Sequence, residues 1–220
     1  MTRARPRRPS PCGGRRPTKA DLDALRADSH DGVHRVGGDG TVGVDDVMPA
    51  DVSAIRLLIV GVNPGLWTAA VNAPFAHPGN RFWPSLHRAG ITDELLDVTR
   101  GLSQEQADGL VRRGLAMTNL VSRPTARADE LDRDELRAGA RRTLALACRL
   151  HPRAVVVVGI TAFRVAFHRP KAKLGIQDIS DMPDWPKDTA LWVLPQPSGL
   201  NAHETVNSLA EKWREVWESV

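Results

Sequence analysis

Four short apolar runs limit the possible folds of this 220-residue sequence more than any other feature. They occupy residues 55–60, 115–121, 154–158 and 190–194. Runs of this length without polar alternation are typical of strands buried on both faces, as in parallel sheets. Helical patterns separate them, and the C-terminal segment is an amphipathic helix. The sequence therefore predicts an α/β fold, a three-layer α/β/α sandwich with a central, mostly parallel sheet of about four to five strands.

The first 50 residues differ in composition from the rest. Residues 1–19 carry seven Lys or Arg and no acid and are rich in proline, which predicts a disordered basic arm. Residues 21–51 are acidic and glycine-rich, as expected of a linker or lid with at most a short helix or hairpin. We therefore expect residues 1–50 to form a largely disordered or lid-like extension and residues 51–220 to form one folded domain.

Charge and cysteine content narrow the class of protein. The sequence carries 30 Lys and Arg and a net charge of +4, and its pI is about 9.6, which favours a polyanionic partner. Two cysteines, Cys12 and Cys148, cannot build a disulfide framework or a four-cysteine cluster, and we expect no metal and no cofactor. No apolar run has the length of a signal peptide or membrane span, so we expect a soluble, cytoplasmic protein without a membrane partner, associated with the nucleoid if its partner is DNA. A monomer is the default expectation for its oligomeric state.

Two of the apolar runs lead into loops rich in Gly, Pro and Asn. The first continues into residues 61–66 and the fourth into residues 195–203. In an open parallel sheet, ligands bind at the carboxyl ends of the strands, where both loops would lie. Pro64 disfavours a helical backbone at Asn63, and Gly65 permits a tight turn, so the Asn63 amide is presented at the loop mouth. One such loop is often only a chain reversal, but two at the same edge favour a binding site.

Three ordered motifs carry a resemblance to a known family. They are Gly-Val-Asn-Pro-Gly at 61–65, Pro-Phe-Ala-His-Pro-Gly-Asn-Arg-Phe-Trp at 74–83 and Pro-Ser-Gly-Leu at 197–200. Over residues 55–217 the chain resembles the mismatch-specific uracil/thymine DNA glycosylases of the uracil-DNA glycosylase superfamily. The resemblance implies a monofunctional enzyme, with residues 51–220 as its catalytic domain. Such an enzyme flips uracil, or thymine and other modified pyrimidines, from mismatched double-stranded DNA and hydrolyses the N-glycosidic bond to begin base excision repair.

The resemblance also assigns roles to individual residues. Asn63 would position the attacking water, Phe75 would stack on the flipped base, and Leu200 would be the wedge that fills the gap in the duplex. The expected base-binding residues are Val62, Gly65, Leu66 and Phe75. The expected residues for wedge insertion and contact with the opposite base are Ser198, Gly199, Leu200 and Asn201. Because Asn201-Ala202 stands where relatives have Ser-Arg, we expect a relaxed preference for the opposite base.

The proton acceptor and the role of two arginines stay open at the level of sequence. An asparagine cannot take a proton from water, which predicts slow hydrolysis unless a carboxylate assists. Asp93 is a weak candidate for that carboxylate, and a helix cap is the competing interpretation. Arg81 and Arg123 are equally consistent with phosphate contacts and with structural ion pairs.

Two other functions are compatible with these patterns. One is an α/β protein that binds a nucleotide or phosphate in the same strand-edge loops, although it would have no use for a wedge at Leu200. The other is a catalytically silent protein that binds damaged DNA, with the basic arm supplying affinity that depends on salt.

Overall fold

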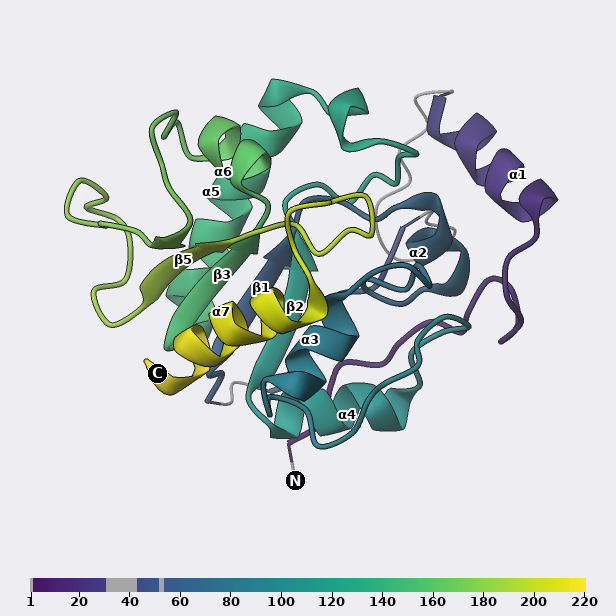
Figure 1. The fold of residues 1–220 in the computed structure, drawn as a ribbon, viewed down its shortest axis with the longest axis horizontal. Coiled ribbons are helices and arrows are strands. Elements are labelled where there is room, and N and C mark those ends of the chain that lie inside the picture. The colour runs from purple at the N-terminus through teal and green to yellow at the C-terminus, as the bar shows by residue number, and fades with distance from the viewer. Residues whose placement is uncertain (1, 31–42, 52–53) are drawn as a thin grey trace.

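The computed structural model describes residues 2–30, 43–51 and 54–220 (Figure 1). Its helices and strands follow one another in this order: α1 (Lys19–His30), β1 (Leu57–Gly61), α2 (Leu66–Val71), α3 (Phe82–Arg88), α4 (Gln104–Arg112), β2 (Leu115–Asn119), the 3₁₀ helix η1 (Ala128–Glu130), α5 (Arg133–Leu150), β3 (Ala154–Val158), α6 (Ile160–Ala166), β4 (Gly175–Ile176), β5 (Ala190–Leu194) and α7 (Val206–Glu218).

The strands form one five-stranded sheet in the order β2-β1-β3-β5-β4. The first four are parallel, and Leu57 of β1 lies opposite Leu115 of β2 on one side and Ala154 of β3 on the other. The fifth, β4, pairs antiparallel with β5. This confirms the predicted α/β fold with a mostly parallel central sheet. The strand β4 was not predicted, because two residues are too few to show a periodicity.

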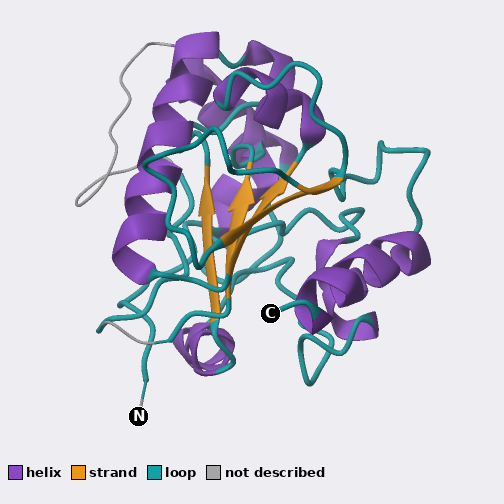
Figure 2. Cartoon of the chain, turned by 90° about the vertical axis from the view of Figure 1, so that its left-hand side faces the viewer, coloured by secondary structure: helices purple, strands orange, loops and turns teal. Residues whose placement is uncertain are grey.

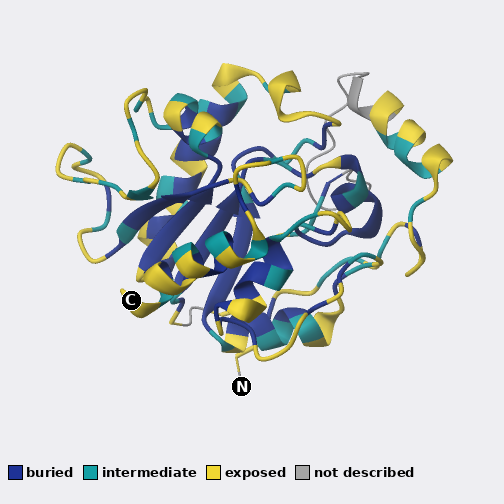
Figure 3. Cartoon of the chain, viewed as in Figure 1, coloured by how far each residue is buried: buried dark blue, intermediate teal, exposed yellow. Residues whose placement is uncertain are grey.

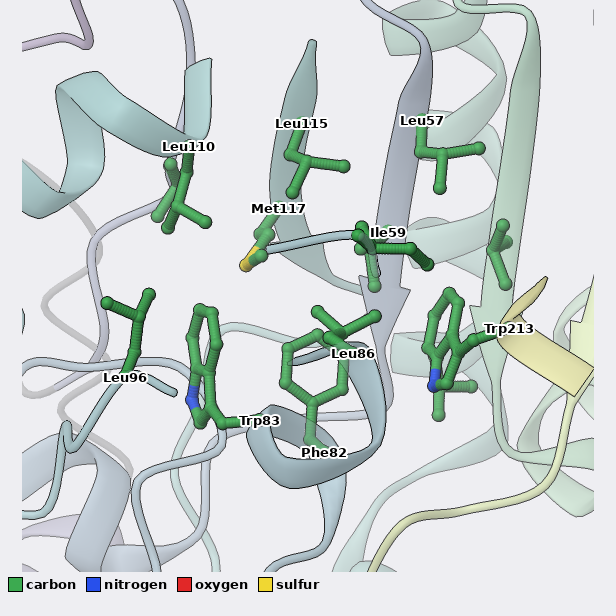
Figure 4. Close-up of a cluster of buried hydrophobic side chains, with 14 of the residues drawn as sticks. Leu57, Ile59, Phe82, Trp83, Leu86, Leu96, Leu110, Leu115, Met117 and Trp213 are labelled. Atoms are coloured by element: carbon green, nitrogen blue, oxygen red, sulfur yellow. The ribbon is translucent and has the colours of Figure 1, made fainter. Parts of the chain in front are cut away.

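Helices cover both faces of the sheet, which Figure 2 shows nearly edge-on between them. On one face, Phe82 and Trp83 of α3 and Trp213 of α7 pack against β1 and β2 (Figure 4). The ring of Phe82 meets that of Trp213 edge-to-face, with centroids 5.7 Å apart. On the opposite face, α5 and α6 pack through Leu136 and Phe163, among others. Each of these side chains contributes about 1.5–3 kcal/mol by leaving water.

The four long strands are buried almost along their whole length, whereas the outer faces of α4 and α7 are exposed (Figure 3). The capping residues of α5 explain its bounds: Asp132 and Glu135 form a capping box at its start, and His151 takes a left-handed conformation at its end. Within the described ranges, no helix is both long and apolar enough to cross a membrane.

The N-terminal segment lies against the domain, unlike the disordered basic arm that composition predicts. Ala4 is buried and pairs with Pro49 in an antiparallel bridge. Further along, the backbone N–H of Cys12 donates to the carbonyl oxygen of Ala70 at 3.2 Å. Composition alone could not reveal these partners, which lie far away in the sequence. Parts of the predicted lid, residues 31–42, fall outside the described residues, as do 52–53.

Asp45 holds this segment by accepting several hydrogen bonds. Its carboxylate accepts from the backbone N–H of Arg8 at 2.7 Å, from Arg8 Nε at 2.6 Å and from Asn72 Nδ2 at 2.8 Å. Arg7 donates to the carbonyl oxygens of Asp45 and Asn72. We call this group, Arg7, Arg8, Asp45 and Asn72, the strap network. It fixes the path of the chain that leads to α1.

Candidate functional site

A cleft of about 1220 Å³ opens where the parallel strands end. The loop after β1, the last residue of β2, the last residue of β3 and the loop after β5 all line it. The structure therefore brings together every predicted site residue except Asp93: Val62, Asn63, Gly65, Leu66, Phe75, Ser198, Gly199, Leu200 and Asn201.

The loop after β1 runs beside the segment that follows β2, and this pairing places Asn63. The backbone N–H of Val121 donates to the carbonyl oxygen of Val62 at 2.9 Å, and that of Thr125 donates to the carbonyl oxygen of Pro64 at 3.1 Å. Asn63 is therefore held between two chain segments. Its Nδ2 lies 3.1 Å from the carbonyl oxygen of Arg123 and 2.7 Å from Thr125 Oγ1.

These contacts decide which end of the Asn63 amide is free for other work. Nδ2 also lies 3.2 Å from the carbonyl oxygen of Pro64, so all of its described partners are hydrogen-bond acceptors. Among the described contacts, none engages Oδ1. An amide whose nitrogen is bound in this way offers its oxygen as an acceptor, which is the group that can hold a water molecule by one of its protons.

Phe75 is fixed by an unusual backbone and by an aromatic neighbour. Its φ of 55° lies in the left-handed region, which costs a non-glycine residue about 1–3 kcal/mol. Its ring stacks on Phe82 with centroids 3.9 Å apart and an interplanar angle of 18°. The side chain is half-buried and lines the cleft. A ring locked in this way can offer an apolar surface to a planar ligand.

Asn119, the last residue of β2, also lines the cleft and was not predicted. Its Oδ1 lies so close to Gly61 that a Cβ added there would be 2.4 Å from it, and the same Cβ would be 3.3 Å from Phe75 Cζ. Glycine at position 61 therefore makes room for both side chains. The amide of Asn119 has no hydrogen-bond partner among the described residues, so both its donor and its acceptor are available. The available signal was a pair of polar residues, Thr118 and Asn119, inside the apolar run 115–121.

The wedge loop, residues 196–201, projects from the end of β5. Leu200 is 95% exposed at its tip. Hydrogen bonds within the loop shape the turn: Leu200 N donates to Ser198 Oγ at 3.2 Å, and Asn201 Nδ2 donates to the carbonyl oxygen of Gln196 at 3.0 Å. The Asn201 side chain is thus engaged inside the loop. The backbone N–H of Gly199 has no acceptor among the described residues.

Asp93 does not lie at the cleft. Its side chain is 80% exposed and forms an ion pair with Arg113 at 2.7 Å, just before β2 begins. This position is at the amino end of β2. At roughly 3.3 Å per residue, it is about 15 Å from the carboxyl end of that strand, which lines the cleft. No helix begins at Asp93, because residues 91–94 form bends. The structure therefore corrects both interpretations of this residue, as a catalytic carboxylate and as a helix cap.

Asp129 is the one carboxylate among the described residues that line the cleft. It is exposed and paired with Arg127 at 2.6 Å. The hydrogen bond from Arg127 holds the pKa of this carboxyl below its usual range. A carboxylate with a lowered pKa is a weak proton acceptor, so Asp129 is poorly suited to activate water.

The two arginines left open by the sequence have different surroundings. The Arg123 side chain is 16% exposed and forms a bidentate pair with Glu135, at 2.9 and 2.7 Å. Arg123 is therefore in the structural ion pair that the sequence had left as one of two possibilities. Arg81 lies under the wedge loop, where its guanidinium donates to backbone carbonyl oxygens of that loop.

Helix α1 lies beside α2 (Figure 1). Its Leu22 and Arg26 line the cleft. These residues are one helical turn apart, so their side chains point to the same side. Helix α1 begins after Thr18, whose backbone N–H and hydroxyl both donate to the carboxylate of Asp21. The sequence predicts a linker or lid for most of this region, with at most a short helix or hairpin.

Two comparisons with known proteins show what the chain is similar to. The family described as the uracil DNA glycosylase superfamily matches residues 50–220. A solution NMR structure described as a "putative Uracil DNA glycosylase from Methanosarcina acetivorans" has 18% sequence identity and a TM-score of 0.50. The match covers 80% of this chain and 96% of that chain. At this identity, the likeness concerns the fold alone.

Proposed function

The chain belongs to the uracil DNA glycosylase superfamily, and from this premise we propose that it is a monofunctional glycosylase acting on uracil in mismatched duplex DNA. The observation that carries the proposal is the orientation of Asn63. Its amide nitrogen is held by acceptors from two chain segments, and its oxygen is left for a water molecule in the same cleft as Phe75.

Recognition of the base rests on Phe75 and Asn119. A base inside a duplex cannot reach the cleft, so it must rotate out of the helix at a cost of a few kcal/mol. Stacking on an aromatic ring returns about 1–3 kcal/mol without distinguishing among bases. The Asn119 amide has one acceptor and two donors on its side chain, which match the N–H and carbonyl groups on the edge of uracil. Uracil and thymine share this edge, so the pocket suits these two bases, and uracil is the one without a 5-methyl group to accommodate.

Hydrolysis follows from the charges that develop as the glycosidic bond breaks. The electron pair of the bond leaves with the base, the sugar becomes positive at the anomeric carbon, and the water oxygen held by Asn63 forms the new bond there. The proton that the water loses passes to solvent, because neither Asn63 nor Asp129 is a good acceptor. Donors that stabilise the departing base lower the barrier without a base catalyst. The first backbone N–H groups of α2 have no acceptors within the helix. We assign to them the stabilisation of the departing base.

The wedge loop supplies the proposed selectivity for weakened base pairs. Leu200, 95% exposed, would enter the space that the flipped base leaves and keep it from returning. Opening costs least where a base is already mispaired, so an enzyme without a strong base catalyst gains most on mismatches. A mononucleotide-binding protein would gain nothing from this exposed leucine, which weighs against that alternative.

Release of the base under single-turnover conditions tests the proposal. Duplexes with one uracil opposite guanine or adenine, or one thymine opposite guanine, are incubated with excess enzyme and then cleaved with alkali at abasic sites. We expect release from the uracil–guanine duplex and a loss of about 10²–10³-fold in Asn63→Ala, as for other groups that act on the transition state. Asn207→Ala, an exposed asparagine on α7, is the matched control. Binding of mismatched duplex by the parent without any release would favour the silent damage-binding protein.

A further inference from the structure

Arg81, immediately before α3, contacts the wedge loop through several hydrogen bonds. Its Nη1 donates to the carbonyl oxygens of Asn201 at 2.8 Å and Ser198 at 3.3 Å, and its Nη2 donates to that of Gly199 at 3.3 Å. Its backbone N–H donates to the carbonyl oxygen of Pro197 at 2.9 Å. This single residue therefore holds the backbone on both sides of Leu200.

These contacts are specific to a guanidinium that has no acidic partner. Within the described part of the chain, no ion pair includes Arg81, whereas Arg123 on the other side of the cleft is paired with Glu135. Arg81 is half-buried, and carbonyl oxygens of the wedge loop are its described acceptors. A guanidinium is planar and holds its donors in a fixed fork, so it sets the relative positions of several carbonyls, whereas the ammonium of lysine is a compact charge with rotatable donors.

A close backbone contact seats the loop on the same support. A Cβ added to Gly199 would lie 2.6 Å from the carbonyl oxygen of Gly79, in the turn that leads to Arg81. Glycine at 199 therefore allows the loop to touch this turn. Both contacts act on the loop backbone and leave the Leu200 side chain 95% exposed.

From this geometry we propose that Arg81 is a positioning residue that presets the wedge loop for insertion of Leu200 into duplex DNA. This inference rests on the proposed glycosylase function. An apolar side chain exposed to water lowers its free energy when it folds back onto the protein, by about 25 cal/mol per Å² of apolar surface buried. Fixing a loop residue costs about 1–2 kcal/mol in conformational entropy. A loop that Arg81 has already ordered avoids these costs when it meets DNA.

The experiment compares two substrates for the same chemistry, a uracil–guanine duplex and a single-stranded oligonucleotide with one uracil. A single strand has no gap to fill, so the wedge is needed only for the duplex. We expect Arg81→Ala to lower the single-turnover rate on the duplex about tenfold or more, equivalent to about 1.4 kcal/mol. On the single strand, the rate of Arg81→Ala should stay within about twofold of the parent's rate, a difference well below about 1.4 kcal/mol. Arg133→Ala, which removes an exposed arginine from the start of α5, is the control.

Further variants separate positioning from other causes. Arg81→Lys keeps the charge but loses the fork, so it should be impaired on the duplex as well. Leu200→Ala should show the same dependence on substrate, and the Arg81→Ala/Leu200→Ala double variant should lose little more than either single variant. If Arg81→Ala fails to fold, Gly199→Ala tests the same seating, because its methyl group would push the loop away from Gly79.

Three outcomes would overturn the inference. Equal loss of rate on both substrates would place Arg81 in the chemistry, and no loss on the duplex would leave it without a role in insertion. Release of uracil from neither substrate by the parent would remove the proposed function and the inference that rests on it. In the first two outcomes the parent still releases uracil, so they overturn the inference alone.

Discussion

The side-chain nitrogen of Asn63 lies 2.7 Å from the hydroxyl oxygen of Thr125, which lies 2.7 Å from the carbonyl oxygen of Arg127. A hydroxyl has one proton, and Thr125 donates it to Arg127. Thr125 can then only accept from Asn63, which requires the nitrogen end of the amide at this position. The short chain Asn63–Thr125–Arg127 therefore fixes the amide orientation on which the proposed water binding depends.

Replacing Thr125 tests this orientation. Thr125→Val preserves the shape but removes the nearest of the three acceptors of Asn63 Nδ2, so the amide is held less firmly. We expect the single-turnover rate to fall about three- to tenfold, the worth of one hydrogen bond. Thr125→Ser keeps the hydroxyl and should retain most of the rate. Affinity for DNA, measured by fluorescence anisotropy, should change little in both. An equally slow Thr125→Ser variant would show that packing, not the hydroxyl, matters.

The pH dependence of base release tests the absence of a carboxylate base. A carboxyl that activates water usually has its pKa raised to about 6–7, so its reaction slows as the pH falls through that value. The Asn63 amide does not titrate, and the pKa of Asp129 is held below its usual range by Arg127. We therefore expect a nearly constant single-turnover rate from about pH 5 to 8. Asp129→Asn should change it by less than about threefold, and a sloped profile abolished in that variant would contradict the mechanism.

Phe75 stacks on Phe82. Replacing Phe75 should therefore weaken the binding of the flipped base and leave the binding of water unchanged. Phe75→Ala removes the surface for the flipped base, worth about 1–3 kcal/mol, so base release should fall about ten- to 100-fold. Phe75→Leu should recover part of the rate, since it restores apolar area but no ring. Phe167→Ala removes a ring stacked on Phe163 away from the cleft and serves as the control. An unchanged rate in Phe75→Ala would exclude stacking at this position.

The sheet and most of the cleft could be predicted because they depend on local pattern and simple topology. Strands buried on both faces show as uninterrupted apolar runs, and parallel strands bring their following loops to one edge. This reasoning placed Asn63 and Leu200 in one cleft although they are far apart in the sequence. It does not reveal Asn119, because the apolar run continues past the strand end into Leu120 and Val121.

Features that depend on long-range partners were predicted less well. Asp93 is near the motifs in sequence, but the chain between α3 and α4 returns to the amino end of the sheet, where Arg113 binds it. The N-terminal segment looked disordered because its partners, Asp45 and Asn72, are 37 and 64 residues from Arg8. The composition of a segment indicates how much apolar surface it can bury by itself. It does not show which hydrogen-bond partners the rest of the chain provides.

The strap network predicts a contribution to stability that depends on pH. Burial alone would raise the pKa of Asp45, but hydrogen bonds from Asn72 and Arg8 outweigh it and hold the pKa below its usual range. A lowered folded-state pKa contributes stability above the unfolded value of about 3.9 and loses it as the pH falls through the folded value. We expect Asp45→Asn to lower the free energy of unfolding at pH 7 by about 1–3 kcal/mol. Urea denaturation at pH 7 and near pH 3 measures it.

The difference between the parent and Asp45→Asn should shrink at the acidic end, because the parent then also loses the charge. Asp23→Asn, on the exposed side of α1, is the control and should leave stability unchanged. A difference that stays constant with pH would mean that Asp45 acts through its shape and neutral hydrogen bonds rather than through its charge.

Arg26 predicts that α1 contributes to the binding of DNA. The strap network directs the chain to α1, and Arg26 of this helix lines the cleft. A guanidinium there would meet a phosphate of the strand that carries the flipped base, releasing about 0.9 counterion. We therefore expect Arg26→Ala to lower the salt slope of log Kd by about 0.9 while the single-turnover rate at saturating enzyme stays unchanged. Arg149→Ala, at the far end of α5, removes the same charge away from the cleft. If both variants keep the parental slope, α1 only walls the cleft, and the phosphate contacts come from other residues.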